Sequence, residues 1–102
     1  MNKYTIVITE QAQIDLRNLS DTIKYQYNAS ITSIKYLRGI YSDMKKLSHN
    51  AESFDIQTRK SLQQYGPSPR RLNYKQMAII YNVINDVVYI RRVIPANTIA
   101  GL

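Results

Sequence analysis

The segment Arg70–Ile94, RRLNYKQMAIIYNVINDVVYIRRVI, constrains the fold more than any other part of the chain. Isoleucine, valine and tyrosine dominate it on both sides of the pair Asn85-Asp86, and such residues favour a pleated, half-buried surface. Two β-rich runs around a two-residue turn predict a β-hairpin, with arms at Gln76–Ile84 and Val87–Ile94. The C-terminal half of the chain should therefore form an antiparallel sheet.

The N-terminal half predicts one strand followed by two helices. Residues Lys3–Thr9 alternate as a half-buried strand does. Thr9 is then placed to cap a helix, and Ser30 to cap a second one. Apolar residues recur at spacings of three and four in both helices: Ala12, Leu16, Leu19 and Ile23 in the first, and Ile34, Leu37, Tyr41, Met44 and Leu47 in the second. A link this short predicts an antiparallel helix pair, and Gly39 inside the second helix suggests a close helix contact.

The rest of the chain completes a single α+β domain over residues 1–102. The sequence leaves residues 48–69 open between a loop and a short helix that would end at Gly66. A strand is expected over Arg70–Tyr74, before the hairpin, and Pro95 should end the last strand. The expected order is therefore β-α-α-β-β-β, with the helix pair packed on a mainly antiparallel sheet.

The hairpin turn also predicts which residues share a face of the sheet. A more apolar face should cover the helix pair, and a more mixed face should stay open for a partner. The first set is Met77, Ile79, Tyr81 and Val83 with Val88, Ile90, Arg92 and Ile94. The second set is Ala78, Ile80, Asn82 and Ile84 with Val87, Tyr89, Arg91 and Val93.

Charge is distributed unevenly along the chain. Of the net +7, residues 56–102 supply +6, since they hold seven Lys and Arg and the single acid Asp86. This half is predicted to present a basic surface to nucleic acid or to an acidic partner. The chain has no cysteine and one histidine, His49, which is expected in a loop. These counts argue against a thiolate or zinc site and against a serine–histidine–aspartate triad. No metal and no cofactor are expected.

The apolar runs are short. None approaches the roughly 18 residues that span a bilayer, and the N-terminus MNKYTIVITE does not resemble a signal peptide. No membrane partner is expected, and the expected compartment is the cytoplasm.

Several motifs in this order resemble the RelE/ParE superfamily of bacterial type II toxins. They are YTIVIT near the N-terminus, Ala12 with Asp15 and Leu16, the unit Arg70-Arg71-Leu72, the run AIIYNV at 78–83, and VVYIRRVI at 87–94. The resemblance covers nearly the whole chain. It implies a two-helix hairpin on an antiparallel sheet and a cognate antitoxin whose C-terminal segment wraps the toxin.

The superfamily divides by target, and the resemblance implies different residues for each branch. RelE-like members cleave messenger RNA in the ribosomal A site, whereas ParE-like members inhibit DNA gyrase. The RelE-like set consists of basic residues and a C-terminal His or Tyr. Only one member of this set, a basic residue on the second strand, has a counterpart here, and that counterpart is Arg71. The equivalent third-strand arginine position is Ala78, and the C-terminal segment reads PANTIAGL. These departures favour a ParE-like toxin, although the C-terminus also departs from the basic and aromatic ending common in ParE.

A few residues are singled out for function. Contact with a partner or nucleic acid is expected of Arg70, Arg71, Tyr74, Asn82 and Arg91. A structural role is weighed against contact for Arg70 and Tyr74. Weak catalytic candidates are Arg71 and Tyr89. Tyr81 is expected in the core, and Arg92, on the core-facing side, is expected either to snorkel to solvent or to pair with an acid on a helix.

Three functions remain open on the sequence. The first is a ParE-like toxin, acting on gyrase and neutralised by an antitoxin. The second is a RelE-like mRNA interferase with a rearranged site, and the third is a non-toxic basic binding domain of the same family.

Overall fold

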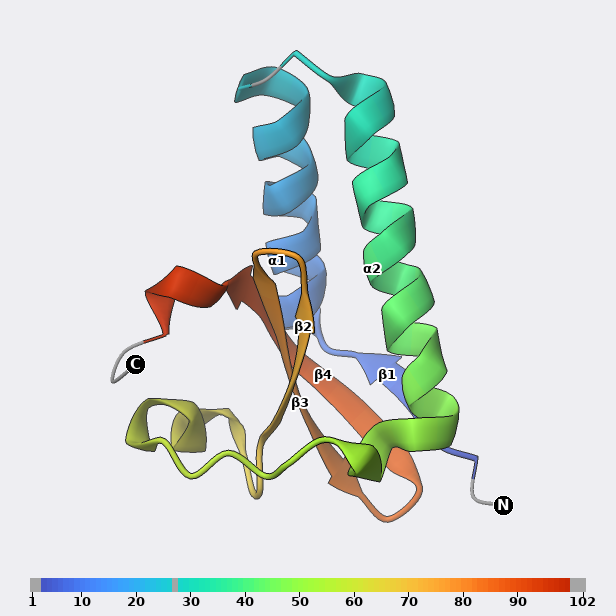
Figure 1. The fold of residues 1–102 in the computed structure, drawn as a ribbon, viewed down its shortest axis with the longest axis vertical. Helices are drawn as coiled ribbons and strands as arrows, with labels where there is room; N and C mark the ends of the chain where they lie inside the picture. Colours follow the sequence, from blue (N-terminus) through green and yellow to red (C-terminus); the bar gives the residue numbers. More distant parts are fainter. Residues whose placement is uncertain (1–2, 27, 100–102) are drawn as a thin grey trace.

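The computed structural model describes residues 3–26 and 28–99, and they form a helix pair on one face of a four-stranded sheet (Figure 1). The sheet has the order β1-β4-β3-β2, in which β1 and β4 are parallel and the other neighbours antiparallel. The strands are β1 Thr5–Ile8, β2 Arg70–Tyr74, β3 Met77–Ile84 and β4 Val87–Pro95. The helices are α1 Glu10–Asp21, the π-helical turn η1 Thr22–Gln26, and α2 Ser30–Asn50. Shorter 3-10 turns follow at η2 Ala51–Ser53, η3 Lys60–Tyr65 and η4 Ala96–Thr98. The predicted α+β order is confirmed.

Local signals account for most element ends. The Thr9 hydroxyl accepts a hydrogen bond from the backbone N–H of Ala12 at 3.3 Å, as its N-cap position predicts. The hairpin turns at Asn85, whose φ of 57° is one that asparagine tolerates. Residues 84 and 87 are paired, so the two-residue turn is confirmed. The cap of α2 is instead Ala29, without a side-chain hydrogen bond, so the prediction for Ser30 was wrong.

The main core lies between the sheet and the helix pair. Its buried members include Ala12 and Leu16 from α1, and Ile40, Met44 and Leu47 from α2. The predicted stripe of α2 is therefore only partly correct. Ile34 and Tyr41 lie on the solvent side, and the buried face instead runs through Ser33 and Ile40. Ser33 is tolerated there because its hydroxyl lies 3.0 Å from the hydroxyl of Ser20 on α1.

The opposite face of the sheet is not open, contrary to expectation. Leu62 of η3 and Ile99 cover Ala78 and Ile80 in a second, smaller core. In Figure 1 the segment with η3 and the turn η4 lie on the side of the sheet away from α2. The sequence left residues 48–69 undecided, and the structure shows a 3-10 turn ending at Gly66 that serves as this cover.

Gly39 marks a close contact with the sheet rather than with the other helix. A Cβ at this position would overlap the phenol of Tyr74, only 2.5 Å from its Cζ. Tyr74 also packs edge-on against Tyr36, with ring centroids 5.2 Å apart. The glycine therefore lets β2 reach the helix.

His49 lies in the last turn of α2 and is exposed, so the expectation of a loop was wrong. Among the helices that the structure describes, none is both long and apolar enough to cross a bilayer.

Candidate functional site

A β-bulge between β3 and β4 places two arginines on the face away from the helices. Ile80 pairs with Arg92, whereas the next residue, Tyr81, pairs with Ile90, so Arg91 is the extra residue. A bulge breaks the alternation of a strand and redirects its side chains. The face assignments beyond the bulge were therefore wrong: Val93 enters the main core, while Arg92 and Ile94 lie on the opposite face.

The two arginines line a cavity of about 480 Å³, here called the arginine pocket. The end of η3, the start of α1 and the bulge of β4 form the sides of this open hollow. Its lining residues are Thr9, Gln11, Gln64, Tyr65, Gly66, Arg91 and Arg92. Guanidinium groups with amide and hydroxyl groups around them suit an anionic ligand such as a carboxylate or a phosphate.

Arg91 is held in place by a buried amide. Its Nε donates to Asn82 Oδ1 at 3.0 Å, and its guanidinium lies 4.9 Å from the ring centroid of Tyr89. Asn82 also donates through Nδ2 to the Tyr65 carbonyl at 2.9 Å. Because Asn82 is fully buried, the expectation that it lies on an open face was wrong. It orients Arg91 and ties η3 to the sheet.

Gly66 allows this arrangement. Its φ of 109° disfavours any other residue, and a Cβ would overlap Asn82 Nδ2. The chain after η3 can therefore approach the amide closely.

Arg92 is paired with a helix acid, as predicted. Its Nε and one terminal nitrogen donate to the Asp15 carboxylate at 2.7 and 3.1 Å. These hydrogen bonds raise the pKa of Arg92, while burial acts in the opposite direction. Asp15 also accepts from the backbone N–H of Val93 at 2.9 Å. Among the described residues no carboxylate pairs with Arg91, which thus supplies the uncompensated charge of the pocket.

The two arginines of β2 have different surroundings. Arg70 donates to the carbonyls of Glu52 and Phe54 at 3.3 and 2.5 Å, which gives it a structural role, and it forms no ion pair with any residue that the structure describes. Arg71 donates to Asn73 Oδ1 at 2.8 Å and is half-buried. Both Arg71 and Arg92 are in register with Ile80, so they lie in one row, about 10 Å apart by strand spacing.

The tyrosines singled out in the sequence also differ in their surroundings. Tyr81 is fully buried and donates to the Ala51 carbonyl at 2.6 Å, and its burial raises its pKa. Its predicted place in the core is confirmed. Tyr74 is half-buried against Tyr36, so a packing role accounts for it. Tyr89 lies beside the arginine pocket under Arg91.

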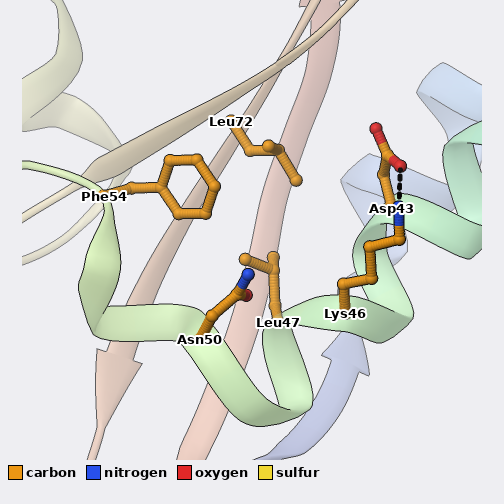
Figure 2. A pocket seen from close by; sticks show the side chains of 6 residues that line it. All are labelled: Asp43, Lys46, Leu47, Asn50, Phe54 and Leu72. Carbon is orange, nitrogen blue, oxygen red and sulfur yellow. Dashed lines mark hydrogen bonds and ion pairs between the residues drawn. The ribbon is translucent and has the colours of Figure 1, made fainter.

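Two further hollows, each with apolar side chains in its lining, lie on the helix side of the molecule. The larger, about 760 Å³, is here called the apolar groove; it lies between the far ends of the helices and the β2–β3 turn. Its apolar lining includes Leu19, Ile23, Ala29, Met77, Pro95 and Ala96. The smaller, about 220 Å³, is shown in Figure 2, where Leu47, Phe54 and Leu72 turn toward one another beside the Asp43–Lys46 ion pair. Sequence periodicity did not indicate either hollow, because each joins elements far apart in the chain.

Comparisons with known proteins agree on the fold. No family model matches the chain, and no curated protein matches its sequence. Among solved structures it is similar to a chain of the chromosomal ParDE TA system from P. aeruginosa, with a TM-score of 0.75 and 17% sequence identity. The match covers 91% of this chain and 96% of that one. The protein therefore has the fold that the RelE/ParE resemblance implied.

Proposed function

We propose that this protein is the toxin of a type II toxin–antitoxin pair, a ParE-like growth inhibitor neutralised by direct binding of its antitoxin. The single observation that carries the proposal is a fold shared over nearly the full length of both chains with a ParDE toxin–antitoxin protein. Gyrase is the proposed target and the cytoplasm the proposed compartment. A role in plasmid stabilisation would follow from such a pair.

The chemistry of the arginine pocket supports binding over RNA cleavage. General acid–base cleavage needs a group that takes and gives a proton near neutral pH. Arginine does this poorly because it stays protonated. The Asp15 carboxylate, which contacts Arg92 of the pocket, is also engaged by the Val93 N–H. Within the described lining of the pocket there is no histidine.

The antitoxin proposed here would offer apolar and acidic groups. Its apolar side chains would enter the apolar groove, and its carboxylates would meet Arg91 and the half-buried Arg71. Replacing Arg71 and Arg91 by Glu should weaken the complex about tenfold or more, since attraction becomes repulsion. The control is Lys60→Glu on η3, which changes the charge by the same amount per substituted site at an exposed position. Calorimetry showing equal affinity for all three proteins would exclude these arginines from the interface.

Induction without the antitoxin tests the function itself. Growth, plasmid supercoiling and protein synthesis would be followed separately in cells that express the toxin alone or together with the small protein encoded beside it. Arrest with altered supercoiling, relieved by the neighbouring protein, is the expected result. Normal growth at high expression would instead favour the non-toxic binding domain.

One observation keeps the RelE-like mRNA interferase as the second candidate. Arg71 and Arg92 lie in one row on one face of the sheet, a spacing that could follow a phosphate backbone. Ribosomes carrying a defined A-site codon would be incubated with the purified protein, and message ends mapped by primer extension. A discrete cut that is lost in Tyr89→Phe or Arg71→Ala would establish the interferase in place of the gyrase inhibitor.

A further inference from the structure

The solvent side of α2 carries large apolar residues that no other described element covers. Ile31, Ile34 and Tyr41 are 72%, 54% and 46% exposed. They lie opposite the buried face that runs through Ile40 and Met44. Single exposed apolar residues are ordinary on protein surfaces, but an aligned set on one helix face marks an interaction site.

The spacing of this set is that of a helix-pairing surface. Positions 31, 34, 38, 41 and 45 alternate steps of three and four, which is the a/d pattern of a coiled coil. Arg38 and Lys45 occupy the remaining two of these positions and are exposed. At 1.5 Å per residue, the row is about 21 Å long. It is called the outer seam of α2 below.

The charge of the outer seam is entirely positive. Arg38 and Lys45 lie within it and Lys35 beside it, while the same face, including Ser42, holds no acid. Polar residues at single a positions of coiled coils select partner and register. An acid on the facing helix would satisfy each cation here.

We propose that the outer seam of α2 docks an amphipathic helix of another protein, one with apolar residues at heptad spacing and acids opposite Arg38 and Lys45. The docking is by helix pairing, with Ile31, Ile34 and Tyr41 packing into the partner. It rests on α2 alone and holds whether or not the protein is a toxin. The arginine pocket and the apolar groove are formed by other surfaces of the molecule.

A second copy of the chain fits this surface poorly. Arg38 is the middle position of the seam, so both parallel and antiparallel pairing of two α2 helices bring Arg38 against its counterpart. Like charges placed together at an interface are strongly disfavoured. The charge pattern therefore selects a different, acidic helix.

Two synthetic peptides test the proposal against the whole protein. Both are 21-residue helices with leucine at the other seam-facing positions; one carries Glu opposite Arg38 and Lys45, and the other carries Lys there. The Glu peptide should bind about tenfold more tightly in calorimetry. The Arg38→Glu variant should reduce or reverse that preference, and Ile34→Ser should weaken both complexes. Amide chemical-shift changes should map to α2.

Several results would overturn the proposal. They are equal affinity for the two peptides, a preference unchanged by Arg38→Glu, no binding at millimolar peptide, or shift changes away from the seam. Because Arg38 is exposed, circular dichroism should show its variants folded like wild type. Sedimentation provides an independent test. The Arg38→Leu variant should self-associate because the repulsion between facing Arg38 side chains is removed, whereas the wild type should stay monomeric. A wild-type dimer formed through α2, or an Arg38→Leu protein that stays monomeric, would also contradict it.

Discussion

The Asp15 carboxylate should contribute more to stability than an exposed charge does, because it accepts four hydrogen bonds while almost fully buried. Two come from the Arg92 guanidinium, one from the backbone N–H of Val93, and a longer one, at 3.4 Å, from the Gln11 side-chain amide. This N–H lies on β4 beyond Ile90, the last residue that pairs with β1. Beyond the end of β1, the Asp15 carboxylate therefore supplies a hydrogen-bond acceptor that a neighbouring strand would otherwise supply.

The cost of removing it can be worked from these contacts. Asp15→Ala leaves the buried Val93 N–H without its acceptor, which costs about 1–3 kcal/mol. Breaking a buried ion pair costs about 3–5 kcal/mol, but the Arg92 side chain is 28% exposed, so water recovers part of that. The two terms overlap, and the expected loss is about 3 kcal/mol. At about 4–8 °C per kcal/mol for a domain near this size, Tm should fall by about 15 °C.

The matched control is the exposed ion pair between Lys46 and Asp43, at 3.5 Å with Lys46 69% exposed. Asp43→Ala should change stability by less than about 1 kcal/mol, as surface pairs do. Urea denaturation of both variants with a common slope gives the comparison directly. The reasoning about the strand edge is refuted if Asp15→Ala and Asp43→Ala cost the same.

Two further substitutions test other contacts. Gly39→Ala should destabilise the protein by about 1–3 kcal/mol, because the added methyl group overlaps Tyr74. In a Tyr74→Ala background the same substitution should stabilise the protein by about 1 kcal/mol, because alanine favours a helix more than glycine does. Thermal melts in which the substitution has the same sign in both backgrounds would contradict the contact. Asn82→Ala should cost about 1–3 kcal/mol and speed proteolytic cleavage after Lys60, because η3 loses its tie to the sheet; unchanged cleavage would separate the amide from that role.

The sequence predicted those elements whose signals are local. The hairpin turn at Asn85, the N-cap at Thr9 and the order of strands and helices each depend on a few neighbouring residues, and all are confirmed. The pairing of Arg92 with a helix acid was also correct, because a long charged side chain beside a core requires a partner.

The α2 faces could not be settled by periodicity, because the helix carries two apolar rows. One runs through Ile40, Met44 and Leu47, and the other through Ile31, Ile34 and Tyr41. Hydropathy alone favoured a mixture of the two. What decides between them is packing against α1 and the sheet, which lies outside the helix sequence.

The faces of β4 were misjudged for a similar reason. Alternation was extended without interruption from the turn, and nothing local marks Arg91 as an unpaired residue. The cover over the second face was missed because 3-10 turns such as η3 lack a clear periodicity. Both errors fall at the arginine pocket, so the site residues were named but not their surroundings.

One structural event explains why the arginines gather where they do. β1 ends at Ile8 while β4 continues to Pro95, so the last part of β4 loses its neighbour. Thr9 donates to the Ile90 carbonyl through its backbone N–H and its hydroxyl, and the Asp15 carboxylate accepts from the backbone N–H of Val93 further along β4. The bulge lies at this same point and turns two successive arginines onto one face. Asp15 neutralises one of them, and the other retains its charge at the mouth of a pocket. A partner that approaches the arginine pocket therefore meets the Arg91 guanidinium, which the buried Asn82 amide holds in place, and this is a more selective contact than the general basic charge of the chain.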